Sequence, residues 1–369
     1  MTGATRRGMT QAMDAFDLYG STRAQLAEHL DAIGVGAKHA ARVARGLHRS
    51  GLELEDIPDL GLRHSEAIRA HSRAATARLT GSQATDDGTT KLVIALEDGA
   101  RVEAVIIPNG DKRATLCVSS QVGCAMACTF CATGTMGLSR GLGAGEIVRQ
   151  FHLARPLAET AGRRITRVVF MGMGEPLHHY AATRDAIAVL TDMNGVALAR
   201  DSVTVSTVGL PARIDQLGAD FGGQIQLALS LHSAQQATRE QLIPIAARHD
   251  LDALRAALQR YPRKSGAWLM LEVVVIPGIT DTAEEIAAIA RFADGLSAIV
   301  NLIPFNPFPG APFRAPSVDE FIEARRRLDA HGTRVRLRLP RGRELAAACG
   351  QLALRDPDEF AAATPTAVE

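Results

Sequence analysis

The chain contains 369 residues, 46% of them hydrophobic, which is enough for a globular core divided into two or three domains. Its formal net charge of +1 predicts no basic field over the whole molecule, and no apolar run is as long as a membrane span. Five cysteines without a recognisable signal peptide argue against a disulfide-stabilised secreted domain, so we expect a cytoplasmic protein.

The N-terminal part is predicted to be helical. Apolar residues recur at helical spacing between residues 22 and 80, with glycines and a proline between the pieces. We therefore expect a small helical accessory domain over residues 1–84. Its basic stretch, His39–Arg49, fits binding to a polyanion, with a solvated helix face as the alternative. Residues 1–15 and those from Asp356 onward are expected to be disordered tails.

A turn and two short strands follow the helical domain. Asp86-Asp-Gly is a turn signal, and Lys91–Leu96 and Val102–Pro108 are typical of the two strands of a hairpin. We expect this hairpin to link the helical domain to a larger core over residues 85–109.

Strand and helix patterns alternate from residue 110 onward. Strands are expected at Ala114–Val118, Arg167–Met171, Val203–Val208, Ile225–Leu231, Leu269–Ile276 and Ile299–Pro304, with helices that include Ala144–Leu153, Ala182–Met193, Leu251–Tyr261 and Ala283–Ala293. Six such repeats predict an α/β fold, a partial (β/α)6 barrel over residues 110–345 with right-handed crossovers. The chemistry of such barrels lies at the C-terminal ends of the strands.

Three of the five cysteines follow the first of these strands. Cys124, Cys128 and Cys131 have the spacing CxxxCxxC, and three thiolates can hold three irons of a [4Fe–4S] cluster. The fourth iron is then open to a small molecule, as reductive cleavage of S-adenosylmethionine requires. Zinc is the alternative, but a zinc site needs a fourth ligand, and the two other cysteines lie too close upstream or more than two hundred residues away.

Polar residues at the ends of the next three strands are candidate contacts to S-adenosylmethionine. Gly174 would let a ligand approach the backbone closely, and Glu175 can accept a hydrogen bond from the ammonium group of a methionine moiety. Ser206 and Ser230 can bind ribose hydroxyls or a carboxylate. The alternative for the Gly-Glu pair is a tight turn without a ligand.

Two further candidates lie at strand ends. Asn306, in a proline-stiffened loop, could pair with an adenine edge or with the methionyl group. His232 taken alone would more often be a core histidine than a ligand.

The C-terminal part is rich in arginine, with eight arginines between Arg325 and Arg343. The segment Arg334–Pro340 alternates strictly, which predicts a strand with three arginines on one face. Such a patch on a neutral protein fits a polyanion bound at a defined place. Cys349 follows in a segment of small residues, and alone it would be a buried small hydrophobe.

Five strings of the sequence resemble those of one known family: Arg113–Cys131, Met171–Pro176, Leu229–His232, Asn301–Pro307 and Ala347–Leu352. They are similar to the RlmN/Cfr family of radical-SAM 23S rRNA (adenine) methyltransferases, over residues 85–353 and more weakly through the N-terminal domain. The resemblance implies a radical-SAM barrel and methylation of an adenine ring carbon, carbon 2, in 23S rRNA and also in tRNA. Methylation of carbon 8, or of a different RNA, is the alternative.

The resemblance also implies roles for individual residues. Those that correspond to cluster ligands are Cys124, Cys128 and Cys131, and those that correspond to catalytic residues are Cys349 (the cysteine that is methylated), Cys117 (its resolving partner) and Glu103 (the proton acceptor). The expected S-adenosylmethionine contacts are Gly174, Glu175, Ser206, Ser230, Leu231, His232 and Asn306. The expected cofactors are a [4Fe–4S] cluster and two S-adenosylmethionine molecules per turnover, and the expected partners of this monomer are RNA and an electron donor such as flavodoxin or ferredoxin.

The implied chemistry uses all five cysteines. An adenine ring carbon is electron-poor and cannot attack a sulfonium methyl group, so a covalent route is needed. Cys349 takes a methyl group, becomes linked to an unstacked adenine through that carbon, and is released when Cys117 attacks its sulfur. A radical-SAM enzyme for a small metabolite or peptide has no need of these two cysteines, and a non-catalytic zinc or iron–sulfur RNA-binding module is the second rival. Gly141 and Ala246 depart from residues common in the family and are candidates for altered RNA specificity.

Overall fold

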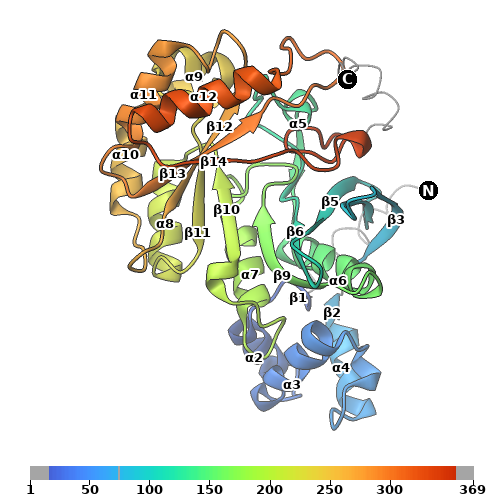
Figure 1. Cartoon of the computed structure of the whole chain (residues 1–369). Coiled ribbons are helices and arrows are strands. Elements are labelled where there is room, and N and C mark those ends of the chain that lie inside the picture. Colours follow the sequence, from blue (N-terminus) through green and yellow to red (C-terminus); the bar gives the residue numbers. More distant parts are fainter. Residues whose placement is uncertain (1–15, 74, 355–369) are drawn as a thin grey trace, which may run out of the picture.

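The chain folds around one large, partly closed sheet whose outer side is covered by helices (Figure 1). This computed structural model describes residues 16–73 and 75–354. The two expected tails, residues 1–15 and the chain from Asp356 onward, lie outside the described residues. Within the described part, no helix combines the length and the apolar character needed to cross a membrane.

The N-terminal region is helical, as expected. Helix α2 (Arg23–Ala32) begins with a capping box, in which Thr22 Oγ1 accepts from the Gln25 amide and the Gln25 side chain accepts from the Thr22 amide. Its buried residues Leu26 and Leu30 join an apolar core of the region's own. The other elements here are β1 (Phe16–Asp17), a 3₁₀ turn (Ala37–His39), α3 (Ala40–Ala44), a π-helical turn (Arg45–Ser50), a 3₁₀ turn (Leu54–Asp56), α4 (Leu62–His71) and β2 (Ser72–Arg73).

The helical prediction is wrong for residues 77–80. Helix α4 ends at His71, and Ala77–Ala84 form strand β3. This strand pairs antiparallel with β4 (Thr90–Leu96), which pairs with β5 (Arg101–Pro108), so the expected hairpin is confirmed and gains a third strand. Pairing decides the outcome, because β3 supplies hydrogen-bond partners to an edge of β4 that would otherwise be open.

Seven parallel strands form the barrel wall: β6 (Arg113–Cys117), β9 (Arg164–Phe170), β10 (Val203–Thr207), β11 (Gln226–Ser230), β12 (Leu269–Val275), β13 (Ala298–Pro304) and β14 (Val335–Leu337). Their crossover helices are α6 (Ala144–Thr160), α7 (Tyr180–Thr191), α8 (Pro211–Phe221), α10 (Leu251–Arg260), α11 (Ala283–Ala293) and α12 (Val318–Ala330). The strand order β14-β13-β12-β11-β10-β9-β6-β5-β4-β3 leaves β14 and β6 unpaired with each other. The predicted partial barrel is therefore confirmed.

Short elements occupy the connecting loops. They are β7 (Gln121–Gly123), α5 (Ala132–Thr135), β8 (Leu138–Gly141), α9 (Gln236–Leu242), and 3₁₀ turns at Arg200–Ser202, Pro244–Arg248 and Arg343–Leu345. β7 and β8 pair with each other, and α5 follows the third of the clustered cysteines directly.

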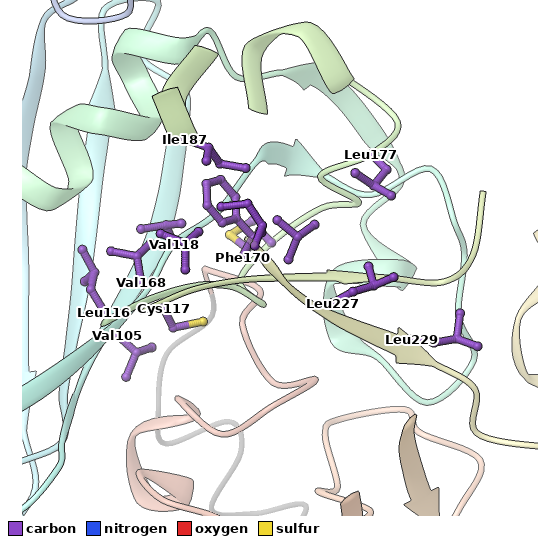
Figure 2. Packing of buried hydrophobic residues seen from close by; sticks show 14 of the residues in the cluster. Val105, Leu116, Cys117, Val118, Val168, Phe170, Leu177, Ile187, Leu227 and Leu229 are labelled. Atoms are coloured by element: carbon purple, nitrogen blue, oxygen red, sulfur yellow. The ribbon is translucent and has the colours of Figure 1, made fainter. Parts of the chain in front are cut away.

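The side chains of β6 and its neighbouring strands alternate between the two faces of the sheet. Leu116, Val168 and Phe170 point from the sheet toward the covering helices, whereas Val105 and Cys117 lie on the other side of the ribbon (Figure 2). Val105 and Cys117 are paired residues of β5 and β6, so they share one face of the sheet. The sulfur of Cys117 therefore points into the barrel.

The segment after β14 crosses from the open edge of the barrel to β5 and α5 (Figure 1). Arg341 Nη1 donates to the Pro108 carbonyl at 2.7 Å, and the Ala132 amide donates to the Gly350 carbonyl at 2.7 Å. The strand expected over Arg334–Pro340 is shorter than predicted, because β14 pairs with β13 only over three residues and then leaves the sheet. This crossing brings Cys349 over the strand ends.

The N-terminal region docks on α6 through a pair of histidines, of which His48 is buried and His152 is partly buried. His48 Nδ1 lies 3.2 Å from His152 Nε2, and Tyr19 packs edge-on against both rings. Burial lowers the pKa of His48 to about 4 and that of His152 well below its usual value. Both imidazoles are therefore neutral at neutral pH.

This pair predicts an acid-sensitive docking contact. An unfolded histidine takes up a proton below about pH 6.5, whereas folded His48 resists protonation down to about pH 4, so stability is lost as the pH falls below 6.5. Through the shifted pKa of His48 alone, lowering the pH from 7 to 5 should reduce the free energy of unfolding by about 2 kcal/mol. Urea unfolding at both pH values should show a smaller loss in a His48→Gln, His152→Gln double variant. An exposed control, His71→Gln, should behave as the parent, and an equal loss in all three proteins would contradict the assignment.

Candidate active site

The largest group of polar residues at the carboxyl ends of the strands surrounds one cavity. Its walls come from the cysteine loop, the ends of β9 to β13 and the C-terminal segment. The cysteine loop and Cys349 therefore face the same space, although more than two hundred residues separate them in the sequence.

Three thiols line one wall of this cavity, as the cysteine spacing predicts. Cys124, Cys128 and Cys131 are free, and they lie on the loop between β7 and α5. Burial raises the pKa of Cys124 to about 12 and also raises the pKa values of Cys128 and Cys131. Among the residues that the structure describes, no three His, Cys, Asp or Glu side chains are arranged to hold a single metal ion, whereas the thiolates of a [4Fe–4S] cluster each bind a different iron.

A buried guanidinium lies beside this loop. Arg239 on α9 is fully buried, and it donates to the backbone carbonyls of Val208, Ser230 and Leu231, at the ends of β10 and β11. Helix α9 also contacts the cysteine loop, where the Thr129 amide donates to the Leu242 carbonyl at 3.0 Å. In the described part of the chain, Arg239 has no carboxylate within ion-pair distance.

These groups fit an anionic iron–sulfur cluster. A buried cation without a carboxylate partner is unfavourable unless another negative charge lies near it. Thiolate ligands of Cys124, Cys128 and Cys131 would supply that charge, and a bound metal also reverses the effect of burial on the thiol pKa values. The residues present are therefore those that a [4Fe–4S] cluster with one open iron needs.

The hydrogen bonds of Arg239 predict that its side chain stabilises the folded protein. In Arg239→Leu, three buried carbonyls lose a charged donor, so the free energy of unfolding should fall by about 3 kcal/mol. Denaturant unfolding of the metal-free protein measures this without any contribution from the cluster. The matched control Arg326→Leu, on the exposed side of α12, should change stability by less than about 0.5 kcal/mol. Equal effects of the two substitutions would show that Arg239 does not hold the strand ends.

The end of β9 forms a tight, charged corner of the cavity. Gly174 has φ +99°, and a Cβ there would lie 2.5 Å from the Gln121 side chain, so only glycine fits. Glu175 accepts hydrogen bonds from the Val208 amide at 2.8 Å and the Leu177 amide at 2.9 Å. Burial nevertheless raises its pKa to about 7. Both residues line the cavity, where Glu175 can meet a ligand ammonium group.

The ends of β10 and β11 place two serines and a histidine in the cavity wall. Ser206 Oγ lies 3.3 Å from Ser230 Oγ, so the two hydroxyls form one polar spot. His232 packs against Phe130 with ring centres 4.4 Å apart and the ring planes tilted by 58°, and its Nδ1 accepts from the Val274 amide. Burial lowers its pKa to about 3, so the ring is neutral. Leu231 is fully buried and does not line the cavity.

Asn306 lines the cavity but is engaged by the C-terminal segment. Its amide group donates to the Cys349 carbonyl at 3.1 Å and accepts from Arg343 at 2.8 Å. Asn306 therefore positions the backbone of Cys349 in this structure.

The two outlying cysteines come from different parts of the fold, Cys117 from strand β6 and Cys349 from the C-terminal segment. Cys349 lines the cavity, and although water can reach its side chain there, the surrounding protein raises its pKa. Cys117 is buried on β6, and burial raises its pKa to about 12. The charge of Cys349 adds to the rise in the pKa of Cys117, and the guanidinium of Arg338 acts to lower the pKa of both thiols. The structure thus brings the two cysteines into one electrostatic environment.

Glu103 lies apart from the cavity wall. It is fully buried on β5, where its carboxylate forms an ion pair with Lys91 Nζ at 2.9 Å. Glu103 lies two positions before Val105, the partner of Cys117, so Glu103 and Cys117 share a face of the sheet. Sequence reasoning missed Lys91, because an isolated lysine at the start of a strand does not by itself indicate burial.

The arginine-rich region divides into separate environments. Arg325, Arg326 and Arg327 pair with acidic residues of the same helix, as a solvated helix face does. Arg334 stacks on Trp268 at 4.2 Å, whereas Arg338 lines the cavity. Arg334 and Arg338, which the alternation places on one face of a strand, therefore lie in different environments.

Comparisons with known proteins agree with this site. The model of the Radical SAM superfamily matches residues 118–293. A dual-specificity RNA methyltransferase RlmN of Magnetococcus marinus is 38% identical, covering 91% of this chain and 94% of the relative, and one of an Anaeromyxobacter species is 41% identical over 87% and 86%. The crystal structure of a radical SAM methyltransferase from Sphaerobacter thermophilus matches with a TM-score of 0.85 and 38% identity, covering 91% of this chain and 99% of that one.

Proposed function

Because this chain belongs to the RlmN family and is a radical S-adenosylmethionine-dependent RNA methyltransferase, we propose that it methylates carbon 2 of an adenine in 23S rRNA, and also acts on tRNA. The observation that carries the proposal is that Cys349 faces the same cavity as the three clustered thiols. A radical SAM enzyme that acts on a small metabolite or peptide has no need of a thiol at that place. The names of the relatives support RNA as the substrate.

The enzyme uses a [4Fe–4S] cluster and S-adenosylmethionine. Cys124, Cys128 and Cys131 would hold the cluster, which when bound supplies the electron that cleaves S-adenosylmethionine reductively. Glu175 would accept from the ammonium group of S-adenosylmethionine, and the Ser206–Ser230 pair would bind its hydroxyls. Gly174 and Asn306 shape the same wall, and the neutral ring of His232, packed against Phe130, adds no charge to it.

The protein's own residues then carry the methyl carbon to RNA. Cys349 accepts a methyl group, and that carbon, once it has lost a hydrogen atom, bonds to the adenine carbon and links RNA to protein. Glu103 accepts the ring proton, and the unpaired electron of the adduct would pass to the oxidised electron carrier, so that the ring regains its closed-shell aromatic state. Cys117 attacks the sulfur of Cys349, the carbon–sulfur bond breaks, and the methylene carbon keeps the bonding electrons and takes a proton to become the methyl group. A Cys117–Cys349 disulfide remains to be reduced.

The remaining parts of the proposal concern partners. The helices of the N-terminal region would hold RNA through the basic stretch His39–Arg49, in which Arg49 is exposed. A flavodoxin or ferredoxin would supply electrons to a cytoplasmic monomer. Loss of methylated adenosine from 23S rRNA and tRNA of a deletion strain, with carbon 2 and carbon 8 products separated by nucleoside mass spectrometry, tests the target.

The cluster assignment predicts that three cysteines behave alike and two differently. Cys124→Ala, Cys128→Ala and Cys131→Ala should each lose the bound iron, the iron–sulfur absorbance and all S-adenosylmethionine cleavage after anaerobic reconstitution, because each removes a ligand. Cys117→Ala and Cys349→Ala serve as matched controls and should keep iron and absorbance. Full cleavage activity in any of the first three variants would contradict the assignment.

The two other cysteines should fail at different steps. Cys117→Ala should form the protein–RNA bond and stall, because no thiol then attacks the sulfur of Cys349. A covalent species should accumulate that survives a denaturing gel and disappears under ribonuclease. Cys349→Ala should form no such species, since it has no methylene carrier. Normal turnover of Cys117→Ala, or the absence of any adduct from it, would refute the two-cysteine route.

A further inference from the structure

A polar row crosses four neighbouring strands inside the barrel. Ser230 pairs in register with Glu272, Glu272 with Asn301, and Asn301 with Arg336. Residues in register on parallel strands share a face of the sheet. Ser230 and Glu272 line the cavity, so the whole row faces the barrel interior. Charged and amide groups in otherwise apolar strands such as Leu269–Val275 are unusual and need a reason.

Glu272 is held in place but keeps part of its carboxylate free. The side chain is buried, and Asn301 Nδ2 donates to its Oε1 at 2.7 Å. Asn301 itself is fully buried, and its Oδ1 has no hydrogen-bond partner among the residues that the structure describes. Within the described ranges, Glu272 forms no ion pair with a lysine or arginine. Its free oxygen is therefore an acceptor that faces the cavity.

Arg338 supplies the complementary donor. Its amide donates to the Leu302 carbonyl at 2.8 Å, which fixes the backbone at the carboxyl end of β13, and its side chain lines the cavity. In the part of the chain with known placement, no carboxylate lies within 4.0 Å of its guanidinium. The charges of both Glu272 and Arg338 act on the Cys349 thiol, in opposite directions, which places both groups near that sulfur.

These two groups are distinct from the expected contacts to S-adenosylmethionine. Glu175, Ser206 and Ser230 come from the ends of β9, β10 and β11, whereas Glu272 and Arg338 come from β12 and the segment after β14. The sulfur of Cys349 must come within one carbon atom of the RNA base when the covalent bond forms. Groups that flank Cys349 in the cavity therefore flank the base as well.

We propose that Glu272, held by Asn301, accepts a hydrogen bond from the exocyclic amino group of the target adenine, and that Arg338 donates to a ring nitrogen of the same base. The inference rests on the proposed function, since it assumes that RNA adenine reaches Cys349. Adenine presents an amino donor beside a ring-nitrogen acceptor, and a carboxylate with a guanidinium offers the matching acceptor and donor. A base taken out of its stack is read through such edge contacts.

The test compares two RNAs in a protein that traps the adduct. In a Cys117→Ala background, adduct formation is followed with an RNA fragment that carries adenosine at the target position and with one that carries purine riboside, which lacks the amino group. With Glu272 present, loss of the amino group should slow adduct formation about tenfold to a hundredfold. Glu272→Met should slow adduct formation with the adenosine RNA by a similar factor, so that the two RNAs form the adduct at equal rates. Glu272→Gln, which keeps an acceptor oxygen, should restore part of the preference.

Three readouts separate this inference from its premise. The methyl group on Cys349, measured by mass spectrometry before RNA is added, should persist in Glu272→Met and Arg338→Met, because this step does not involve the base, and its presence shows that the variants fold. An exposed control, Glu284→Met, should match the background in every measurement. Loss of the Cys349 methyl group in Glu272→Met, or an unchanged preference for adenosine, would overturn the inference alone. Absence of both methyl group and adduct in the background protein would refute the proposed function, and the inference with it.

Discussion

The burial of three thiols beside a guanidinium without a carboxylate partner is the constraint on which the rest of the structure depends. Cys124, Cys128 and Cys131 have pKa values raised by burial, and Arg239 shares their surroundings without an ion-pair partner among the described residues. Neither arrangement is favourable alone, but together with a metal–thiolate group of negative charge they are complementary. Arg239 also holds the carbonyls at the ends of β10 and β11. The same residue thus links the charge of the proposed cluster site to the shape of the wall that we propose binds S-adenosylmethionine.

The open side of the barrel is the second requirement of the chemistry. Because β14 and β6 do not pair, the interior can be reached from the side, and the segment that follows β14 can cross that opening. Cys349 is carried on this segment by contacts to Asn306 and Ala132 rather than on a strand. In the proposed route this thiol meets a methyl donor, an RNA base and Cys117 in turn, which needs such a connection, since a residue within a paired strand could not change partners. Its proposed partners Cys117 and Glu103 lie on strands β6 and β5, whereas Cys349 lies on a loop.

The sequence predicted the parts that depend on local signals. The spacing of Cys124–Cys131 and the alternation of strands and helices needed no knowledge of distant contacts, and the barrel was found as expected. Strand β3 was missed because its pairing with β4, and not its own composition, makes it a strand. Arg239 and Lys91 were missed because burial of a charge depends on partners supplied by other elements. Glu272 and Asn301 did leave a signal, since each interrupts an apolar strand, and only the register shows that they lie in one row.

Isotope labelling tests the central claim, that the methyl carbon reaches RNA through Cys349, most directly. S-adenosylmethionine with a fully deuterated methyl group would be supplied to the reconstituted enzyme with RNA, and the methylated nucleoside analysed by mass spectrometry. Passage through a methylene bound to Cys349 removes one deuterium and replaces it with a solvent proton, so the product should carry two deuterium atoms. A product that retains all three would mean direct transfer of an intact methyl group and would contradict the account.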